Sequence, residues 1–473
     1  MLFRQIRDPK LSQYAYLVGC QRTGEALIID PQRDVDRYLT LAEEEGLDLV
    51  AAAETHIHAD FLSGARELAE AHGVKLYLSA EGGPDWQYEW ARHGDYDLHL
   101  LRDGDTFEIG QIQIQALHTP GHTPEHLSFL VTDRGGGVQE PMGIATGDFV
   151  FVGDLGRPDL LETAAGQAGQ QEPSARTLYQ SVKSFLHLPD YLQLWPGHGA
   201  GSACGKALGA VPFSTVGYEK RFNASIDASR QSEDHFVDQI LEGQPEPPLY
   251  FATMKRLNRE GPPVLMGLPR PPRLSPTEVA AALLDGVVVV DTRSDRRRFM
   301  EHHLVGSLYA PLDNTFPTIA GSYLRPEDDI LLVVDPESAD EALRDLVRIG
   351  FDRVVGYAPP EVLNHPTLAG HRQEIPIIAF PRVAELVDGD EAVPLDVRSA
   401  AEHAAGSFRR SLNIPHTRLL DRLQEVPKDR EVLTYCASGA RAAAASALLQ
   451  RSGRKVRYVD DDFAHWHGAR RPA

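Results

Sequence analysis

Cysteine is scarce in this chain. Its 473 residues include only three cysteines, which are Cys20, Cys204 and Cys436. An odd number of thiols spread over distant regions does not form a disulfide framework, so we expect three free thiols, each with its own chemistry.

Long apolar runs are also missing. No stretch of the sequence approaches the roughly 20 apolar residues that a membrane-spanning helix needs. The segment Met1–Lys10 lacks the apolar core of a signal peptide. We therefore expect a cytoplasmic protein without a membrane partner.

Basic residues are fewer than acidic residues in this chain. Lys and Arg number 47 against 68 Asp and Glu, which gives a formal net charge of -21, and no basic run occurs. This balance excludes nucleic acid and anionic membranes as expected partners. The 42% of hydrophobic and 24% of charged residues are ordinary for a globular protein. Because a single core rarely exceeds about 250 residues, the length predicts several domains.

A short loop that begins with the third cysteine is the most informative motif. Glu431–Tyr435 is a β-prone run and Ala442–Gln450 is a run of helix formers, so the loop between them is a strand-to-helix turn. Its small residues let backbone N–H groups point inward, and the helix N-terminus adds a partial positive charge. Such a turn stabilises a thiolate or a persulfide anion, whereas a lone cysteine is more often a buried core residue. The loop consists of Cys436, Ala437, Ser438, Gly439, Ala440 and Arg441.

This loop resembles the active-site loop of the rhodanese family of sulfurtransferases, in which six residues begin with the cysteine and end on an arginine. The resemblance covers roughly residues 376–473 and includes the upstream run Leu395–Ser399. It implies that Cys436 carries a sulfane sulfur beside the permanent charge of Arg441. One departure is that Asp461 and Asp462 stand where the family usually has two glycines, which alters the charge of the wall expected behind the loop.

The C-terminal half contains an internal repeat. Apolar strands such as Ile330–Val334 alternate with helical segments such as Asp340–Ile349, which predicts parallel sheets. We expect two rhodanese-like α/β domains, at 277–372 and 376–473, after a proline-rich linker at 256–276. The repeat is carried by Val290–Ser294 with Glu301, His302, Gly306 and Ser307, which echo Leu395–Ser399 with Glu402, His403, Gly406 and Ser407.

The two copies differ at the loop. Aligning their strands places Asp335 opposite Cys436 and Asp340 opposite Arg441. The first loop therefore lacks a nucleophile, and its carboxylates would repel a bound anion. We predict that the first copy is inactive in sulfur transfer and serves as a spacer or a docking domain.

The N-terminal half carries a separate set of histidines and aspartates. They lie in turns rich in glycine, proline or threonine that follow apolar runs, which is where a scaffold presents side chains to a shared cleft. Imidazole and carboxylate groups together suit zinc, iron or manganese. Surface histidines would explain the first motif alone, but not four spaced motifs. The residues are His56, His58, Asp60, His122, Asp148 and His198.

These four motifs, in this order, resemble the metallo-β-lactamase superfamily over about residues 1–255. The resemblance implies an αββα sandwich. Most hydrolytic members bind two metals and have a histidine directly after the aspartate of the first motif, where this chain has Phe61. Phenylalanine has no ligand atom, so a mononuclear centre is expected.

A narrower resemblance is to the persulfide dioxygenase branch, which shares the motif stretch from Gly147 to Asp159. It implies one Fe(II) held by His56, His122 and Asp148, an arrangement that leaves open positions for substrate and dioxygen. The remaining members of the set would orient these ligands or water, and they are His58, Asp60 and His198.

Two further residues each have two interpretations. Arg157 resembles a residue that holds the anionic thiol carrier, and a structural ion pair explains it equally well. Cys204 resembles a cysteine beside the iron that accepts sulfur, and the glycines and Lys206 near it would lower its pKa. Its alternative is tight packing in a glycine-rich turn.

The combined resemblances imply an enzyme that oxidises a thiol persulfide with dioxygen and transfers sulfane sulfur between persulfide, sulfite and thiosulfate. They also imply a homodimer or a homotetramer. The thiol carrier and the direction of transfer stay open. Two other functions remain: a zinc hydrolase of the glyoxalase II or lactamase type with an accessory sulfur domain, and a sulfur relay or docking module without catalysis.

Overall fold

The structure is a computed structural model that describes residues 1–163, 169–244, 246–464 and 466. Its residues form two compact units. The first comprises Met1–Leu268 together with Arg348–Gly350, and the second comprises the rest of the described chain.

The first unit contains two mixed sheets of six strands each. In the first sheet β1 to β3 pair antiparallel, and β3 to β6 pair parallel. Its strands, in spatial order, are β1 (Leu2–Asp8), β2 (Gln13–Cys20), β3 (Glu25–Ile29), β4 (Asp48–Ala53), β5 (Lys75–Ser79) and β6 (Leu98–Leu101).

In the second sheet β10 and β11 are parallel, and the other neighbours are antiparallel. Its strands, in spatial order, are β12 (Ser214–Thr215), β11 (Gln193–Pro196), β10 (Gly143–Gly147), β9 (Leu127–Asp133), β8 (Ile112–His118) and β7 (Thr106–Ile109).

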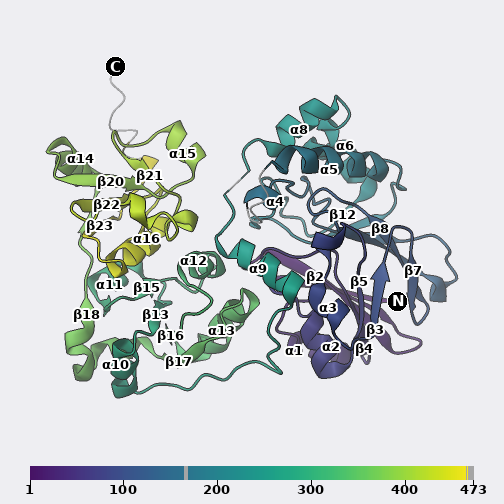
Figure 1. Ribbon diagram of the computed structural model, residues 1–473, viewed down its shortest axis with the longest axis horizontal. Coiled ribbons are helices and arrows are strands. Elements are labelled where there is room, and N and C mark those ends of the chain that lie inside the picture. The colour runs from purple at the N-terminus through teal and green to yellow at the C-terminus, as the bar shows by residue number, and fades with distance from the viewer. Residues whose placement is uncertain (164–168, 245, 465, 467–473) are drawn as a thin grey trace. The chain divides into compact units, whose positions relative to one another are not determined.

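The two sheets pack face to face between two layers of helices (Figure 1). Strand β2 shows why, because its alternate residues serve different cores. Tyr16 and Val18 pack between the sheets, whereas Ala15 and Leu17 pack against the layer of α1 and α2. The predicted αββα sandwich is therefore confirmed. Its helices are α1 (Asp36–Glu44), α2 (Ala65–His72), α3 (Glu89–His93), α4 (Leu160–Thr163), α5 (Gln171–Phe185), α6 (Val216–Phe222), α7 (Ala224–Ala228), α8 (Glu233–Leu241) and α9 (Tyr250–Glu260).

The second unit contains two parallel sheets with the same strand order. The first sheet runs β15 (Leu308–Tyr309), β13 (Val288–Asp291), β16 (Ile330–Val333) and β17 (Val354–Ala358). The second runs β21 (Leu412–Asn413), β20 (Ala392–Asp396), β22 (Glu431–Tyr435), β23 (Val456–Val459) and β19 (Ile377–Ile378). Strands β14 (His303–Leu304) and β18 (Arg372–Gln373) form a separate two-stranded antiparallel sheet.

The repeat predicted from sequence is confirmed by this topology. The helix after the first loop, α13 (Ala339–Arg348), and the helix after the second, α16 (Ala440–Arg451), begin at the positions that the alignment makes equivalent. The other helices of the unit are α10 (Pro276–Leu284), α11 (Arg296–Glu301), α12 (Phe316–Tyr323), α14 (Phe380–Asp388) and α15 (Ala400–Ala405). The two copies touch each other, because α16 packs against β15 and α11 of the first copy.

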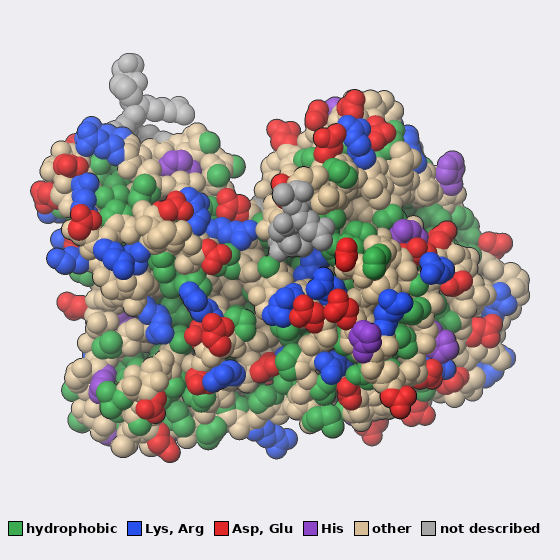
Figure 2. All heavy atoms as spheres, in the orientation of Figure 1, with side chains coloured by type: hydrophobic (Ala, Val, Ile, Leu, Met, Phe, Trp, Pro, Cys, Tyr) green, Lys and Arg blue, Asp and Glu red, His purple; other side chains and the backbone are tan. Residues whose placement is uncertain are grey.

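Surface charge and helix length agree with the composition. Figure 2 shows acidic and basic side chains interspersed on the face that it draws, rather than one broad basic surface. Among the described residues, every helix is too short or too polar to cross a bilayer.

Candidate functional site

Three predicted metal ligands meet at one end of the sandwich. His56 follows β4 of the first sheet, His122 lies in the loop between β8 and β9, and Asp148 follows β10 of the second sheet. All three are buried, and their ligand atoms lie within 4.8 Å of one another. Oδ2 of Asp148 is 3.9 Å from Nε2 of His56 and 3.6 Å from Nε2 of His122.

The free atoms of this cluster fit one cation. Nε2 of His56 and Oδ2 of Asp148 are buried without a hydrogen-bond partner among the described residues. Metal bonds of about 2.0–2.2 Å to histidine and carboxylate would need only a small contraction of the cluster. Burial lowers the pKa of His122 to about 4, so this ring is neutral at physiological pH, as a metal ligand must be.

Hydrogen bonds fix the direction in which both histidines point. The hydroxyl of Thr55 donates to Asp30 at 2.8 Å and therefore accepts from Nδ1 of His56 at 2.9 Å. Nδ1 of His122 donates to the carbonyl oxygen of Arg157 at 3.0 Å. Each ring thus carries its proton on Nδ1, which leaves both Nε2 lone pairs for a metal. Asp30 was not among the residues predicted from the sequence, although it follows the buried strand β3 directly.

His198 lies between two carboxylates. Its Nδ1 is 2.6 Å from Asp148 and its Nε2 is 2.7 Å from Asp60. Burial opposes protonation of this ring, but the two carboxylates outweigh it and raise the pKa of His198 to about 10. Both ring nitrogens therefore donate, and His198 orients Asp148. Gly197 permits the contact, since a Cβ there would lie 2.6 Å from Oδ1 of Asp148.

His58 turns away from the three-residue cluster. Its Nε2 lies 3.2 Å from Asp30 and 3.1 Å from Glu54, and its ring packs 4.3 Å from Phe61. Asp60, His198 and Cys204 form another group of neighbouring ligand atoms. The structure thus brings together all the predicted residues of this half in adjoining groups, and their assignment as ligands or orienting residues stays a prediction.

Arg157 makes the contacts of a structural ion pair, which was one of its two predicted roles. It is buried and donates to both oxygens of Asp159, at 2.9 and 2.6 Å, and to the carbonyl oxygen of Ala203 at 3.0 Å. These contacts fix the segment whose carbonyl oxygen, that of Arg157, accepts from His122. Its role toward a thiol carrier stays a prediction.

The pKa of the Cys204 thiol is raised, whereas the sequence predicted that it is lowered. Burial, with the nearby charges of Asp60 and Asp148, raises the pKa of its thiol well above the ordinary value. The prediction that Lys206 lowers this pKa is wrong, because its ammonium donates to the carbonyl oxygens of Gln239 and Glu242 instead. The sequence spacing of two residues did not show that the lysine points elsewhere.

The loop in the second unit places Cys436 at the predicted strand-to-helix turn. The side chain is buried, and the N–H of Gly439 donates to its Sγ at 3.2 Å. Gly439 has φ +90°, and a Cβ there would lie 2.6 Å from Oη of Tyr458. Any other residue at this position would disturb the turn that holds the sulfur.

Arg441 is held by Glu402, a residue of the repeat motif to which the sequence assigned no role. Its guanidinium donates to both oxygens of Glu402 at 2.7 Å, and this contact lowers the pKa of Glu402 to about 2. Glu402 also completes a capping box with Ser399 at the start of α15. The charge of Arg441 is therefore shared between the loop and this carboxylate.

The first rhodanese-like copy contributes directly to the second loop. Arg296 donates from Nη2 to the carbonyl oxygen of Ser438 at 2.9 Å and from Nε to Asp460 at 3.0 Å. Tyr323, at the end of α12, is buried, and the charge of Cys436 adds to the effect of burial in raising its pKa. A spacer alone would not need these contacts, so the first copy builds part of the loop's surroundings.

Replacing Arg296 by Met should slow persulfide formation at Cys436 by about threefold to tenfold, because a partly exposed charge-assisted hydrogen bond to the loop is lost. Mass spectrometry after mixing with thiosulfate measures the rate. The matched control is Arg297→Met, since Arg297 also binds Asp460 but does not bond to the loop. Equal rates in the two variants would contradict a role for the first copy at the loop.

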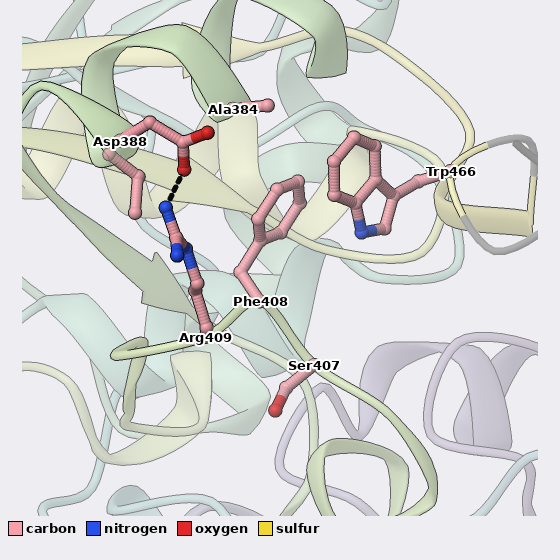
Figure 3. A pocket seen from close by; sticks show the side chains of 7 residues that line it. Ala384, Asp388, Ser407, Phe408, Arg409 and Trp466 are labelled. Atoms are coloured by element: carbon pink, nitrogen blue, oxygen red, sulfur yellow. Dashed lines mark hydrogen bonds and ion pairs between the residues drawn. The ribbon is translucent and has the colours of Figure 1, made fainter. Parts of the chain in front are cut away.

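The second rhodanese-like domain contains two pockets, of which one borders the loop. The mouth of the loop is a pocket whose lining includes Glu402, Ala437 and Asp462, so the predicted acidic departure lies at the entrance. Figure 3 shows a second pocket, in which the ring of Phe408 stands beside Trp466 and Arg409 pairs with Asp388. The rings of Phe408 and Trp466 stack with centroids 4.3 Å apart.

The stability of this domain should fall in mild acid because of His416. Burial, with a smaller effect of Arg441, lowers its pKa to about 4, whereas the unfolded side chain titrates near 6.5. Between these values the unfolded state binds a proton that the folded state does not, so stability drops as pH falls, by roughly 2 kcal/mol. Calorimetry of His416→Gln between pH 7 and pH 4.5 should show a shallower loss than the unaltered protein. Parallel profiles would contradict this assignment.

Comparisons with known proteins agree with the two kinds of domain. The model of the metallo-β-lactamase superfamily matches residues 8–198, and that of the rhodanese-like domain matches residues 381–469. Human mitochondrial persulfide dioxygenase ETHE1 is 30% identical over 201 residues, covering 42% of this chain and 68% of that protein. A probable metallo-hydrolase of Burkholderia pseudomallei is 31% identical, covering 49% and 82% of the two chains. The crystal structure of a metallo-beta-lactamase from Staphylococcus aureus has a TM-score of 0.67 at 41% identity, covering 76% of this chain and 99% of that one.

The chain therefore belongs to the metallo-β-lactamase superfamily. Within it, persulfide dioxygenases are among the homologues of the N-terminal domain, and a rhodanese-like domain is fused on the C-terminal side.

Proposed function

We propose that this protein oxidises the sulfane sulfur of a low-molecular-weight thiol persulfide to sulfite, and that it transfers sulfane sulfur through Cys436. The observation that carries the first part is a buried ligand set in which Nε2 of His56 and Oδ2 of Asp148 have no hydrogen-bond partner among the described residues. His56, His122 and Asp148 supply two imidazoles and one carboxylate. His198 is bound to carboxylates, and Phe61 stands where a second metal would need a ligand.

The proposed reaction consumes a persulfide, dioxygen and water and yields a thiol, sulfite and two protons. An Fe(II) held by the two histidines and the aspartate would supply the coordination of sulfur and dioxygen, while the electrons that reduce dioxygen come from the sulfane sulfur. The chain's own part is orientation. Asp30, acting through Thr55, and the carbonyl oxygen of Arg157 hold the histidine rings, and His198 holds Asp148. Burial of the cluster keeps bulk water from the reacting groups.

The rhodanese-like domain would act on the same sulfur. A persulfide on Cys436 transfers its outer sulfur to sulfite, which gives thiosulfate and restores the thiolate. The reverse reaction uses the same residues. The N–H of Gly439 stabilises the anionic sulfur, and Arg441 adds positive charge to the loop.

Metal content and oxygen uptake of the purified full chain test this proposal. Iron near one equivalent, with oxygen consumption on addition of glutathione persulfide or coenzyme A persulfide, is the expected result. Bound zinc with thioester hydrolysis and no oxygen uptake would reject the dioxygenase activity and favour a hydrolase.

A further inference from the structure

Helix α9 packs against the loop of the first histidine motif and carries a buried lysine, Lys255. The helix is bound to the loop of the first motif, because Nδ2 of Asn258 donates to the carbonyl oxygens of His58 and Phe61 at 2.9 and 2.7 Å. Lys255 lies one turn earlier on the same buried face. Burial is the main cause of the lowered pKa of His122 and the charge of Lys255 adds to it, so the two side chains share one buried region.

Lys255 is buried without the partners that a buried ammonium needs. The residue is only 6% exposed, and Nζ has no hydrogen-bond partner among the described residues. Its one close neighbour of opposite polarity is the face of Trp86, whose ring centroid lies 4.5 Å away. An ammonium has three donors, so the aromatic face leaves most of its bonding capacity unused.

Two other buried polar atoms near Lys255 are also unpaired. Oη of Tyr88 and Oε2 of Glu125 have no hydrogen-bond partner in the described part of the chain. The charge of Glu125 acts on both Lys255 and Tyr88. Three buried polar groups from separate segments are therefore left unpaired in the region of Lys255. The ammonium of Lys255 and the hydroxyl of Tyr88 can both donate, which suits a small ligand with acceptor oxygens.

We propose that Lys255 binds the anionic end of a ligand held at the metal cluster, and that this ligand is a small sulfur oxyanion of the sulfite type. The inference rests on the proposed function, because sulfite is the product of the proposed oxidation. A carboxylate of the thiol carrier has the same anionic chemistry. Full burial of Lys255 favours the smaller ion, since a peptide carrier would keep its carboxylates nearer the surface.

The charge state of Lys255 supports this assignment. Burial lowers its pKa to about 8, with partial compensation by Glu125. The side chain therefore remains mainly protonated at neutral pH, and a bound anion would add to that preference.

Binding of sodium sulfite to the metal-depleted full chain tests the inference without relying on catalysis. Calorimetric titration should show binding that weakens with salt, and Lys255→Met should bind at least about tenfold more weakly. Lys255→Arg, which keeps the charge, should retain most of the affinity. The matched control is Lys183→Met, because Lys183 also lies over an aromatic ring, that of Tyr179, but donates to the carbonyl oxygen of Ser229.

The possible outcomes separate the alternatives. Loss of glutathione binding with unchanged sulfite binding in Lys255→Met would assign the lysine to the carrier and overturn the inference. Equal sulfite affinity in all variants, or no sulfite binding to the unaltered chain, would also overturn it. Lys255→Gln is measured in parallel in case the methionine variant does not fold. Sulfite binding through Lys255 without any oxygen uptake would reject the proposed dioxygenase and leave the anion site standing.

Discussion

Asp148→Asn is expected to abolish persulfide-dependent oxygen uptake and to lower iron affinity by at least about 100-fold. The amide keeps the shape of the side chain but removes the negative charge that a cation requires. It also replaces a strong acceptor of the His198 bond at 2.6 Å. Metal analysis and an oxygen electrode measure both effects in the same preparation.

The control for this change is Asp190→Asn, because Asp190 lies in the same unit, is mostly exposed and pairs with Lys220 on the surface. It should bind iron and consume oxygen as the unaltered protein does. An Asp148→Asn protein with full iron content and full oxygen uptake would remove Asp148 from the metal site.

Cys436→Ser is expected to eliminate persulfide formation in the rhodanese-like domain, with transfer rates reduced by at least about 1000-fold, because serine is not a sulfur nucleophile. Oxygen uptake with an organic persulfide should continue. If the physiological direction forms thiosulfate, sulfite accumulates in this variant. If the domain loads the thiol carrier from thiosulfate, oxygen uptake driven by thiosulfate disappears instead.

Cys20→Ser is the matched thiol control. Cys20 is buried in β2, where its Sγ accepts from the N–H of Gln111. Its replacement should leave sulfur transfer intact. Transfer that survives Cys436→Ser but is lost in Asp335→Ala would show that the first copy, rather than the second, is active.

Much of the fold followed from local pattern. The strand Glu431–Tyr435 and the loop after it were readable because a β-prone run changes directly to an alanine-rich helix. The repeat was readable because both copies keep the same strand-end motif. For the metal cluster, each motif lies at a strand end, and strands of one sandwich bring such ends together.

The residues that complete each site could not be predicted, because their contacts join segments far apart in the sequence. Arg296 precedes its partner Ser438 by 142 positions, and Lys255 follows Trp86 by 169 positions. Glu402 was visible in a motif, but only the folded chain shows that it binds Arg441. For Lys206, neighbourhood in sequence suggested a contact with Cys204 that the turn of the chain prevents.

The position of the cluster at the seam of the sandwich has a consequence for the lifetime of the protein. One candidate ligand, His56, belongs to the first sheet, and the other two belong to the second. A cation bound by all three would link the two sheets. It would stabilise the folded chain, and the stabilisation would increase with its binding affinity. If the bound cation is the proposed iron, its scarcity would reduce both the activity and the amount of this protein, since the metal-free form would open and be degraded more readily.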